Sequence, residues 1–126
     1  PPLLFFKEKG YLVVPSLLSK TFVTDLLQKI RNQLDQCAKD LSCSYEDYLQ
    51  VASRWIDPSP ITTGLEQLIL KPLKNCLETL MEDACELVKL NVISKTPSAP
   101  DPVPFHQDIS YSPQAPYEFS AWLALT

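Results

Sequence analysis

The sequence predicts an α+β fold in which helices pack against an antiparallel sheet. In the first two thirds of the chain, apolar residues recur every three or four positions, which is typical of amphipathic helices. From Leu87 onward the period changes to two, which is typical of strands. Helices come first and strands follow, without regular alternation of the two. We therefore assign residues 1–86 mainly to helices and residues 87–126 to the strands of the same single domain.

The segment from Phe5 to Pro15 predicts a short helix or turn that runs into Gly10, followed by a brief strand. Gly10 is placed to end the helix or turn, because glycine tolerates the backbone conformations of helix ends. Residues 11–14, Tyr-Leu-Val-Val, are aromatic, apolar and β-branched, and Pro15 follows them. A strand is expected over these four residues.

A long amphipathic helix is predicted after Ser19. The Ser19 hydroxyl is placed to accept a hydrogen bond from an amide of the first turn, and Leu18 and Val23 are spaced for a hydrophobic staple. Apolar residues then recur at helical spacing from Phe22 to Cys37, with charged and polar residues between them. This pattern indicates one helix with one buried face.

The middle of the chain predicts two more helical stretches. A short helix is expected at residues 45–52 and a loop at residues 57–60. A longer helix is expected from Thr62 or Thr63 to Met81. Pro72 lies inside it, and because proline lacks the amide that an interior position needs, it either kinks this helix or starts a second one.

Two runs of alternating residues predict strands, at residues 87–95 and 118–125. In the first run Val88, Leu90 and Val92 fall on one face, opposite Asn91. Between the two runs, residues 96–104 hold four prolines, a composition that excludes a central strand and predicts an extended loop.

The composition of the chain limits the classes of function and the cellular location that we expect. The net charge of −4, from 15 acidic and 11 basic residues, leaves no basic stripe for a phosphate backbone, so nucleic acid is not expected as a partner. No apolar stretch approaches the roughly 20 residues that span a bilayer, and no leader pattern opens the chain. An intracellular, cytoplasmic setting without membrane association is expected.

The four cysteines favour free buried thiols over two disulfides, because no C-x-x-C pair is present and the helices already provide a core. The spacings also disfavour a structural zinc site, since the one histidine lies far downstream of all four. A disulfide-rich secreted domain is the alternative. The cysteines are Cys37, Cys43, Cys76 and Cys85.

The residues most informative about chemistry are His106 and Asp108. If the chain is extended there, both side chains project from the same face and can converge on one cation. An imidazole and a carboxylate are two of the three ligands of a facial triad for Fe(II). The alternative for this short motif is a solvated histidine beside a turn-forming aspartate.

The order of features along the chain resembles the phytanoyl-CoA dioxygenase family. The opening residues 6–19 are similar to that family's aromatic residue, Gly-aromatic pair, β-branched strand and capped helix. The run Ile93-Ser94-Lys95-Thr96-Pro97 resembles its strand before a proline-bearing loop, and His106-Gln107-Asp108 follows. After Tyr111, residues 120–125, Ser-Ala-Trp-Leu-Ala-Leu, resemble its next core strand.

The resemblance implies an Fe(II)- and 2-oxoglutarate-dependent dioxygenase whose helices pack on a double-stranded β-helix, a jelly roll of the cupin type. His106 and Asp108 would be metal ligands, and Gln107 and Trp122 would contact 2-oxoglutarate. Asn91 matches a cosubstrate-lining position but departs from the methionine known there. The alternatives are a solvated Gln107, a strand-edge Asn91 and a core Trp122.

Family members hydroxylate small molecules or acyl-CoA thioesters and release succinate and carbon dioxide, with ascorbate as a candidate reductant. Asp108 favours hydroxylation, because related halogenating enzymes leave the carboxylate position free for a halide. Lys95 is a candidate contact for an acidic substrate, with a solvated strand-end lysine as the alternative.

The chain departs from the family pattern in lacking a second histidine and a downstream arginine. Its two arginines, Arg31 and Arg54, both precede the motif. The first residue is Pro1 and the last, Thr126, lies in an alternating run, so we expect a piece of a longer enzyme whose jelly roll is incomplete here. The alternative is a catalytically inactive, shortened relative acting as a binding or scaffold module. An unfinished sheet edge would favour self-association.

Overall fold

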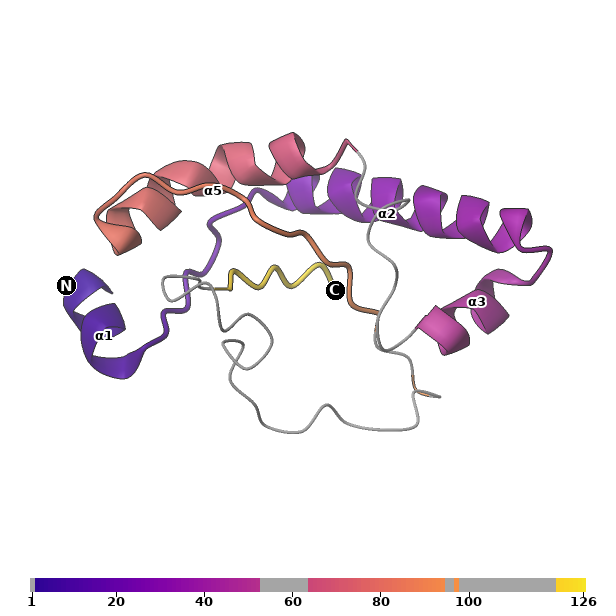
Figure 1. Ribbon diagram of the computed structural model, residues 1–126, viewed down its shortest axis with the longest axis horizontal. Coiled ribbons are helices and arrows are strands. Elements are labelled where there is room, and N and C mark those ends of the chain that lie inside the picture. Colours follow the sequence, from indigo (N-terminus) through magenta and orange to yellow (C-terminus); the bar gives the residue numbers. More distant parts are fainter. Residues whose placement is uncertain (1, 53–63, 95–96, 98–119) are drawn as a thin grey trace.

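The computed structural model describes residues 2–52, 64–94, 97 and 120–126. Their helices are α1 (Pro2–Lys9), α2 (Lys20–Asp40), α3 (Tyr45–Ala52) and α5 (Glu66–Met81). The two long helices, α2 and α5, run along one edge of the molecule, and α1 and α3 lie near opposite ends of it (Figure 1). Residues 85–94 and 120–126 lie on the same side of these two long helices (Figure 1).

Of the short helix or turn predicted from Phe5 to Gly10, the structure shows a helix, α1, which begins three residues earlier than predicted, at Pro2. Gly10 ends it with φ 76°, and the Gly10 amide donates to the Phe6 carbonyl at 2.8 Å. The strand predicted at residues 11–14 is wrong, since none of these residues is in a strand. Tyr11 instead packs edge-on against Phe5, with ring centroids 5.5 Å apart. β-branched residues favour extended backbone, but a strand also needs a neighbour for its backbone hydrogen bonds, which local sequence does not specify.

Helix α2 begins and packs as the sequence predicts. Ser19 is its N-cap, with extended backbone (φ −68°, ψ 151°), and its Oγ accepts a hydrogen bond from the Phe22 amide at 3.1 Å. One face of the helix is buried, and the residues on it are Leu26, Ile30, Leu34 and Ala38. The three- and four-residue spacing therefore identified the face that meets the core.

The predicted helix at residues 45–52 is confirmed as α3, where the Ser44 hydroxyl accepts from the Asp47 amide at 3.0 Å. Helix α5 begins at Glu66, a few residues after the predicted start, and runs as one helix through Pro72. Of the two outcomes open for Pro72, a new helix start is excluded. The proline side chain is exposed, so its ring needs no room in the core. The loop predicted at residues 57–60 lies outside the described residues.

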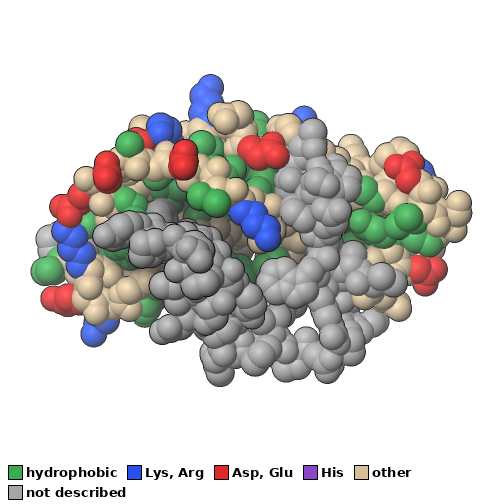
Figure 2. All heavy atoms as spheres, viewed as in Figure 1, with side chains coloured by type: hydrophobic (Ala, Val, Ile, Leu, Met, Phe, Trp, Pro, Cys, Tyr) green, Lys and Arg blue, Asp and Glu red, His purple; other side chains and the backbone are tan. Residues whose placement is uncertain are grey.

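The core is formed where α2 meets the first half of α5. Its buried members come three from α2 and three from α5 and the residue before it: Leu26, Ile30, Leu34, Leu65, Ile69 and Leu73. Four apolar side chains of the two later segments pack against this cluster: Leu90, Val92, Leu123 and Leu125. Where the described residues form the outline of the molecule, acidic and basic side chains are interspersed, with hydrophobic ones between them (Figure 2).

The strands predicted at residues 87–95 and 118–125 are not seen in the part of those runs that the structure describes. Neither 87–94 nor 120–126 is in a strand. The physical reason is that alternation fixes which side chains share a face, whereas a strand also requires a paired backbone. The helical half of the predicted α+β fold is therefore observed, and the sheet remains a prediction.

Within the described ranges, none of the helices combines the length and the apolar character needed to cross a membrane.

Candidate functional site

Two of the five predicted site residues lie within the described structure. Asn91 and Trp122 are described, whereas His106, Gln107 and Asp108 lie outside the described residues, as do Lys95 and Arg54. Arg31 is an exposed residue of α2, as expected. The geometry of the site is therefore built from the segments that carry Asn91 and Trp122.

Asn91 lies on a segment whose side chains alternate between the helical core and solvent from Leu90 onward. Val88, which was predicted to share the face of Leu90 and Val92, is 74% exposed and does not pack against the core cluster, so that part of the prediction is wrong. Leu90 and Val92 pack against the core cluster, whereas Asn91 is exposed. Ile93 is 41% exposed, a large fraction for an isoleucine that follows a half-buried valine. Burial with a period of two is the signature of an extended chain lying on a surface. The amide of Asn91 thus belongs to the face turned away from α2 and α5.

Trp122 has the same relation to the helices as Asn91. Its neighbours Leu123 and Leu125 pack against the core cluster, whereas 74% of Trp122 is exposed. A core role for Trp122, one of the two interpretations left open by the sequence, is excluded within the described structure. Its indole is available to contact a ligand or another part of the protein.

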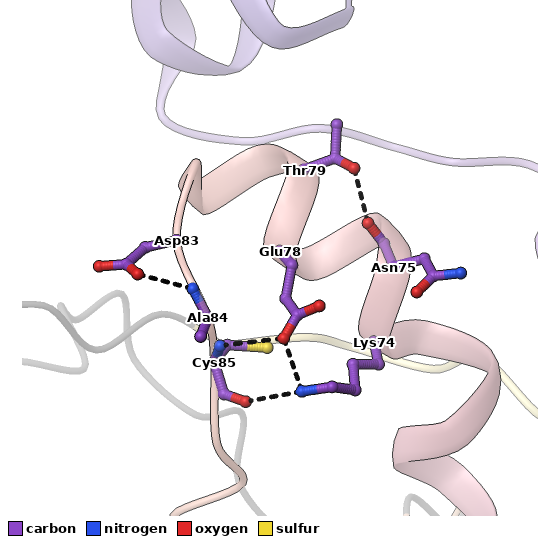
Figure 3. Close-up of polar contacts among 7 residues, drawn as sticks. All are labelled: Lys74, Asn75, Glu78, Thr79, Asp83, Ala84 and Cys85. Atoms are coloured by element: carbon purple, nitrogen blue, oxygen red, sulfur yellow. Dashed lines mark hydrogen bonds and ion pairs between the residues drawn. The ribbon is translucent and has the colours of Figure 1, made fainter.

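The start of the Asn91 segment is attached to α5 by three polar contacts around the backbone of Cys85 (Figure 3). The Lys74 ammonium forms an ion pair with the Glu78 carboxylate at 2.5 Å and donates to the Cys85 carbonyl at 3.4 Å. The Cys85 amide donates to Glu78 Oε1, also at 3.4 Å. We call this group of Lys74, Glu78 and the Cys85 backbone the Cys85 clasp.

The two charged groups of the clasp stabilise each other's ionised form. The hydrogen bond to Glu78 raises the pKa of the Lys74 ammonium above its ordinary value. The same bond, with a smaller contribution from the Cys85 amide, lowers the pKa of the Glu78 carboxyl. Both groups therefore stay charged at neutral pH while holding the chain that leaves α5.

The direction of the chain after α5 is also set at the helix end. Glu82 takes a left-handed conformation (φ 55°) that ends the helix, and its carboxylate pairs with Lys7 of α1. Asp83 then accepts a hydrogen bond from the Ala84 amide at 2.7 Å. The chain reverses there, and residues 85–94 return along α5 (Figure 1).

Sequence reasoning missed the clasp, although part of its signal was visible. Lys74 and Glu78 are four residues apart in a predicted helix, a spacing that brings opposite charges together. Their contacts with Cys85 depend on the chain reversal after Met81, which the sequence pattern did not show.

The cysteines are free, as predicted, but the expectation that they are buried is wrong. Cys37, Cys76 and Cys85 are partly exposed and Cys43 is exposed. Cys37 and Cys76 lie in α2 and α5, whereas Cys43 and Cys85 lie just after the ends of these helices. None of the four belongs to the buried cluster, although Cys37 packs against it. Within the residues that the structure describes, no group of three or more His, Cys, Asp or Glu side chains is placed to hold a metal ion.

Comparison with known proteins gives one match. The family model described as phytanoyl-CoA dioxygenase (PhyH) matches residues 6–126 of the chain. No curated protein and no solved structure matches the chain. The matched range includes the end of α1, the other three described helices, both alternating segments and the stretch with His106 and Asp108.

Proposed function

The chain belongs to the phytanoyl-CoA dioxygenase family, and we propose from this that the native protein is an Fe(II)- and 2-oxoglutarate-dependent dioxygenase. The observation that carries the proposal is a family match over nearly the whole chain that includes His106-Gln107-Asp108. The proposed substrate is a small molecule or an acyl-CoA thioester, hydroxylated with release of succinate and carbon dioxide. The setting is intracellular and cytoplasmic.

The donor chemistry of the chain fits part of an iron site. The imidazole of His106 and the carboxylate of Asp108 are ligand types that suit Fe(II), and their spacing suits one shared cation in an extended chain. Bound iron and 2-oxoglutarate together supply the oxidative decarboxylation that drives hydroxylation. The sequence provides neither a second histidine nor an arginine after this motif. In this proposal the third ligand and the carboxylate-binding arginine come from outside these 126 residues, which are inactive alone.

Within the site, the chain's own residues bind and orient. Gln107 and Asn91 offer amide groups to 2-oxoglutarate, and Trp122 offers an aromatic face beside it. The exposure of Asn91 and Trp122 supports this, because both side chains are free of the helical core. We further propose that residues 1–86 provide the helical support and residues 87–126 the first strands of a jelly roll. Ascorbate is a candidate reductant.

The second candidate function is a binding or scaffold module without catalysis. It is favoured by one observation, the single histidine in the chain. In that case the segments at residues 87–94 and 120–126 would offer backbone groups to a partner or to a second copy of the chain.

Anaerobic titration of Fe(II), with and without 2-oxoglutarate, tests the proposal. The native protein at its full length is expected to bind Fe(II) tightly, and the 126-residue chain weakly. The double substitution His106→Ala, Asp108→Ala is expected to abolish tight binding in the native protein. Asp25→Ala, which removes an exposed carboxylate from α2, is the matched control and should bind as the native protein does. If the double variant binds iron as tightly as the native protein, the oxygenase proposal fails and the scaffold function replaces it.

A further inference from the structure

Helix α1 lies outside the core that joins α2 and α5. None of its residues is buried, and within the described structure none of them belongs to the core cluster or packs against it. It contacts α5 near the C-terminal end of that helix (Figure 1). An isolated helix of fewer than about 12 residues is marginal in water, and α1 has 8. Its helical structure therefore depends on contacts with the rest of the protein.

An ion pair joins α1 to the end of α5. The Lys7 ammonium pairs with the Glu82 carboxylate, and about half of each side chain is exposed. Such a pair adds little stability and is weakened by salt. The apolar contribution to docking is limited as well, because Leu3 and Phe6 are only half-buried. The attachment of α1 is therefore weak enough for the ion pair to affect it measurably.

The backbone of Glu82 is unusual for a residue with a long side chain. Glu82 has φ 55° and ψ 25°, the left-handed conformation in which α5 ends. Glycine is the residue that most often takes this conformation at a helix end, because a side chain makes it unfavourable. Glycine could not supply the contact with Lys7. The carboxylate at this position thus serves the docking of α1 and not the ending of α5.

We propose that Lys7 and Glu82 form a salt-sensitive latch that docks α1 reversibly on α5, and that α1 is helical only while it is docked. Release converts residues 2–9 into an unfolded arm that stays joined to α2 through Gly10 and the residues after it. Glu82 also precedes the turn into residues 85–94, so the arm docks where that segment begins. This inference is independent of the proposed function.

The Gly10 amide reports the docked state, because it donates to the Phe6 carbonyl at the end of α1. Its hydrogen-exchange protection is measured by NMR in the native, full-length protein. Glu82→Gln removes one charge of the latch and should lower this protection about two- to five-fold. Raising the salt concentration should lower it similarly in the native protein and have little effect in Glu82→Gln.

Charge reversal tests whether the pairing itself docks the helix. Lys7→Glu places two carboxylates together and should lower the protection at Gly10 more than Glu82→Gln does. Combining Lys7→Glu with Glu82→Lys restores a pair of opposite charges and should recover most of the protection. Glu82→Gly removes the latch but suits the left-handed backbone, so it should lower the protection without lowering the melting temperature.

Lys39→Gln is the matched control, because it breaks a comparable exposed pair with Asp35 on α2. It should leave the protection at Gly10 unchanged, and protection at the buried Ile30 verifies that each variant keeps its core. If neither salt nor Glu82→Gln changes the protection at Gly10, apolar contacts hold α1 and the latch is overturned. A loss in Lys7→Glu that the double variant does not recover also overturns it, because the pairing of opposite charges would then not be what docks the helix.

Discussion

The helical layer and the two later segments obtain their structure from different sources. Helix α2 closes its hydrogen bonds within itself, so its cap at Ser19 and its periodic apolar residues are enough to define it. The segments at residues 87–94 and 120–126 have an equally regular pattern, yet within the described structure they are not strands. A repeating pattern therefore specifies a helix almost completely, whereas for a strand it specifies only which face is buried.

Truncating the Leu26 side chain, in the helical layer, should lower the stability of the protein more than any substitution in the two later segments. Leu26 is 1% exposed at the contact between α2 and α5, so Leu26→Ala leaves a cavity in the only described region where two long helices meet. We expect a loss of about 2–5 kcal/mol in the free energy of unfolding, measured by urea denaturation. Leu41→Ala, at a leucine that is 68% exposed, is the control and should change it by less than about 0.5 kcal/mol. Equal losses in the two variants would contradict the assigned core.

A smaller effect should distinguish the two faces of residues 120–126. Leu123 packs against the core cluster, so Leu123→Ala is expected to cost about 1–2 kcal/mol, less than a fully buried leucine. Trp122→Ala removes a larger side chain from the neighbouring position, but 74% of that side chain is exposed, and we expect little change in stability. Both are measured by urea denaturation without metal or cosubstrate. The reverse order would mean that the tryptophan, and not the leucine, faces the helices.

The helices could be predicted from sequence in nearly all respects. Ser19 marked the start of α2, and the helix at residues 45–52 was located to the residue. The sequence did not decide whether the helix continues through Pro72. A proline inside a helix destabilises it, and whether the helix continues depends on how strongly its other residues pack in the folded protein, which local sequence does not show. The strand at residues 11–14 was wrong for a related reason. Its β-branched residues favour an extended backbone, but within the described residues no neighbouring strand pairs with them.

The sequence predicted which residue types belong to the candidate site, but not which of their side chains are exposed. Both faces of residues 120–126 carry apolar residues, so the sequence alone did not decide whether Trp122 or Leu123 faces the core. Packing against α2 and α5 decides it. His106, Gln107 and Asp108 remain predictions, because they lie outside the described residues.

The smallest expected effect concerns the Cys85 clasp, which joins the two regions. Its side chains are solvent-accessible, so Lys74→Met should scarcely change the melting temperature. It removes the donor to the Cys85 carbonyl and the ion-pair partner of Glu78, so hydrogen-exchange protection at the Cys85 amide should fall. Asp35→Asn, which breaks the comparable pair between Lys39 and Asp35 on α2, should leave that protection unchanged.

The pH dependence of the clasp follows from the direction of its two pKa shifts. The pKa of Glu78 is lowered in the folded protein, so its contribution is present above the ordinary glutamate pKa and is lost as pH falls through the lowered value. The pKa of Lys74 is raised, so its contribution is complete below the ordinary lysine pKa and is lost as pH rises through the raised value. Protection at Cys85, corrected for intrinsic exchange, should therefore be constant around neutral pH and decline at both extremes. In Lys74→Met the alkaline decline should disappear. A decline that persists there would show that a titrating group other than Lys74 causes it. Protection that does not change with pH in the native protein would show that the segment is held to α5 by its apolar contacts, through Leu90 and Val92, and not by the clasp.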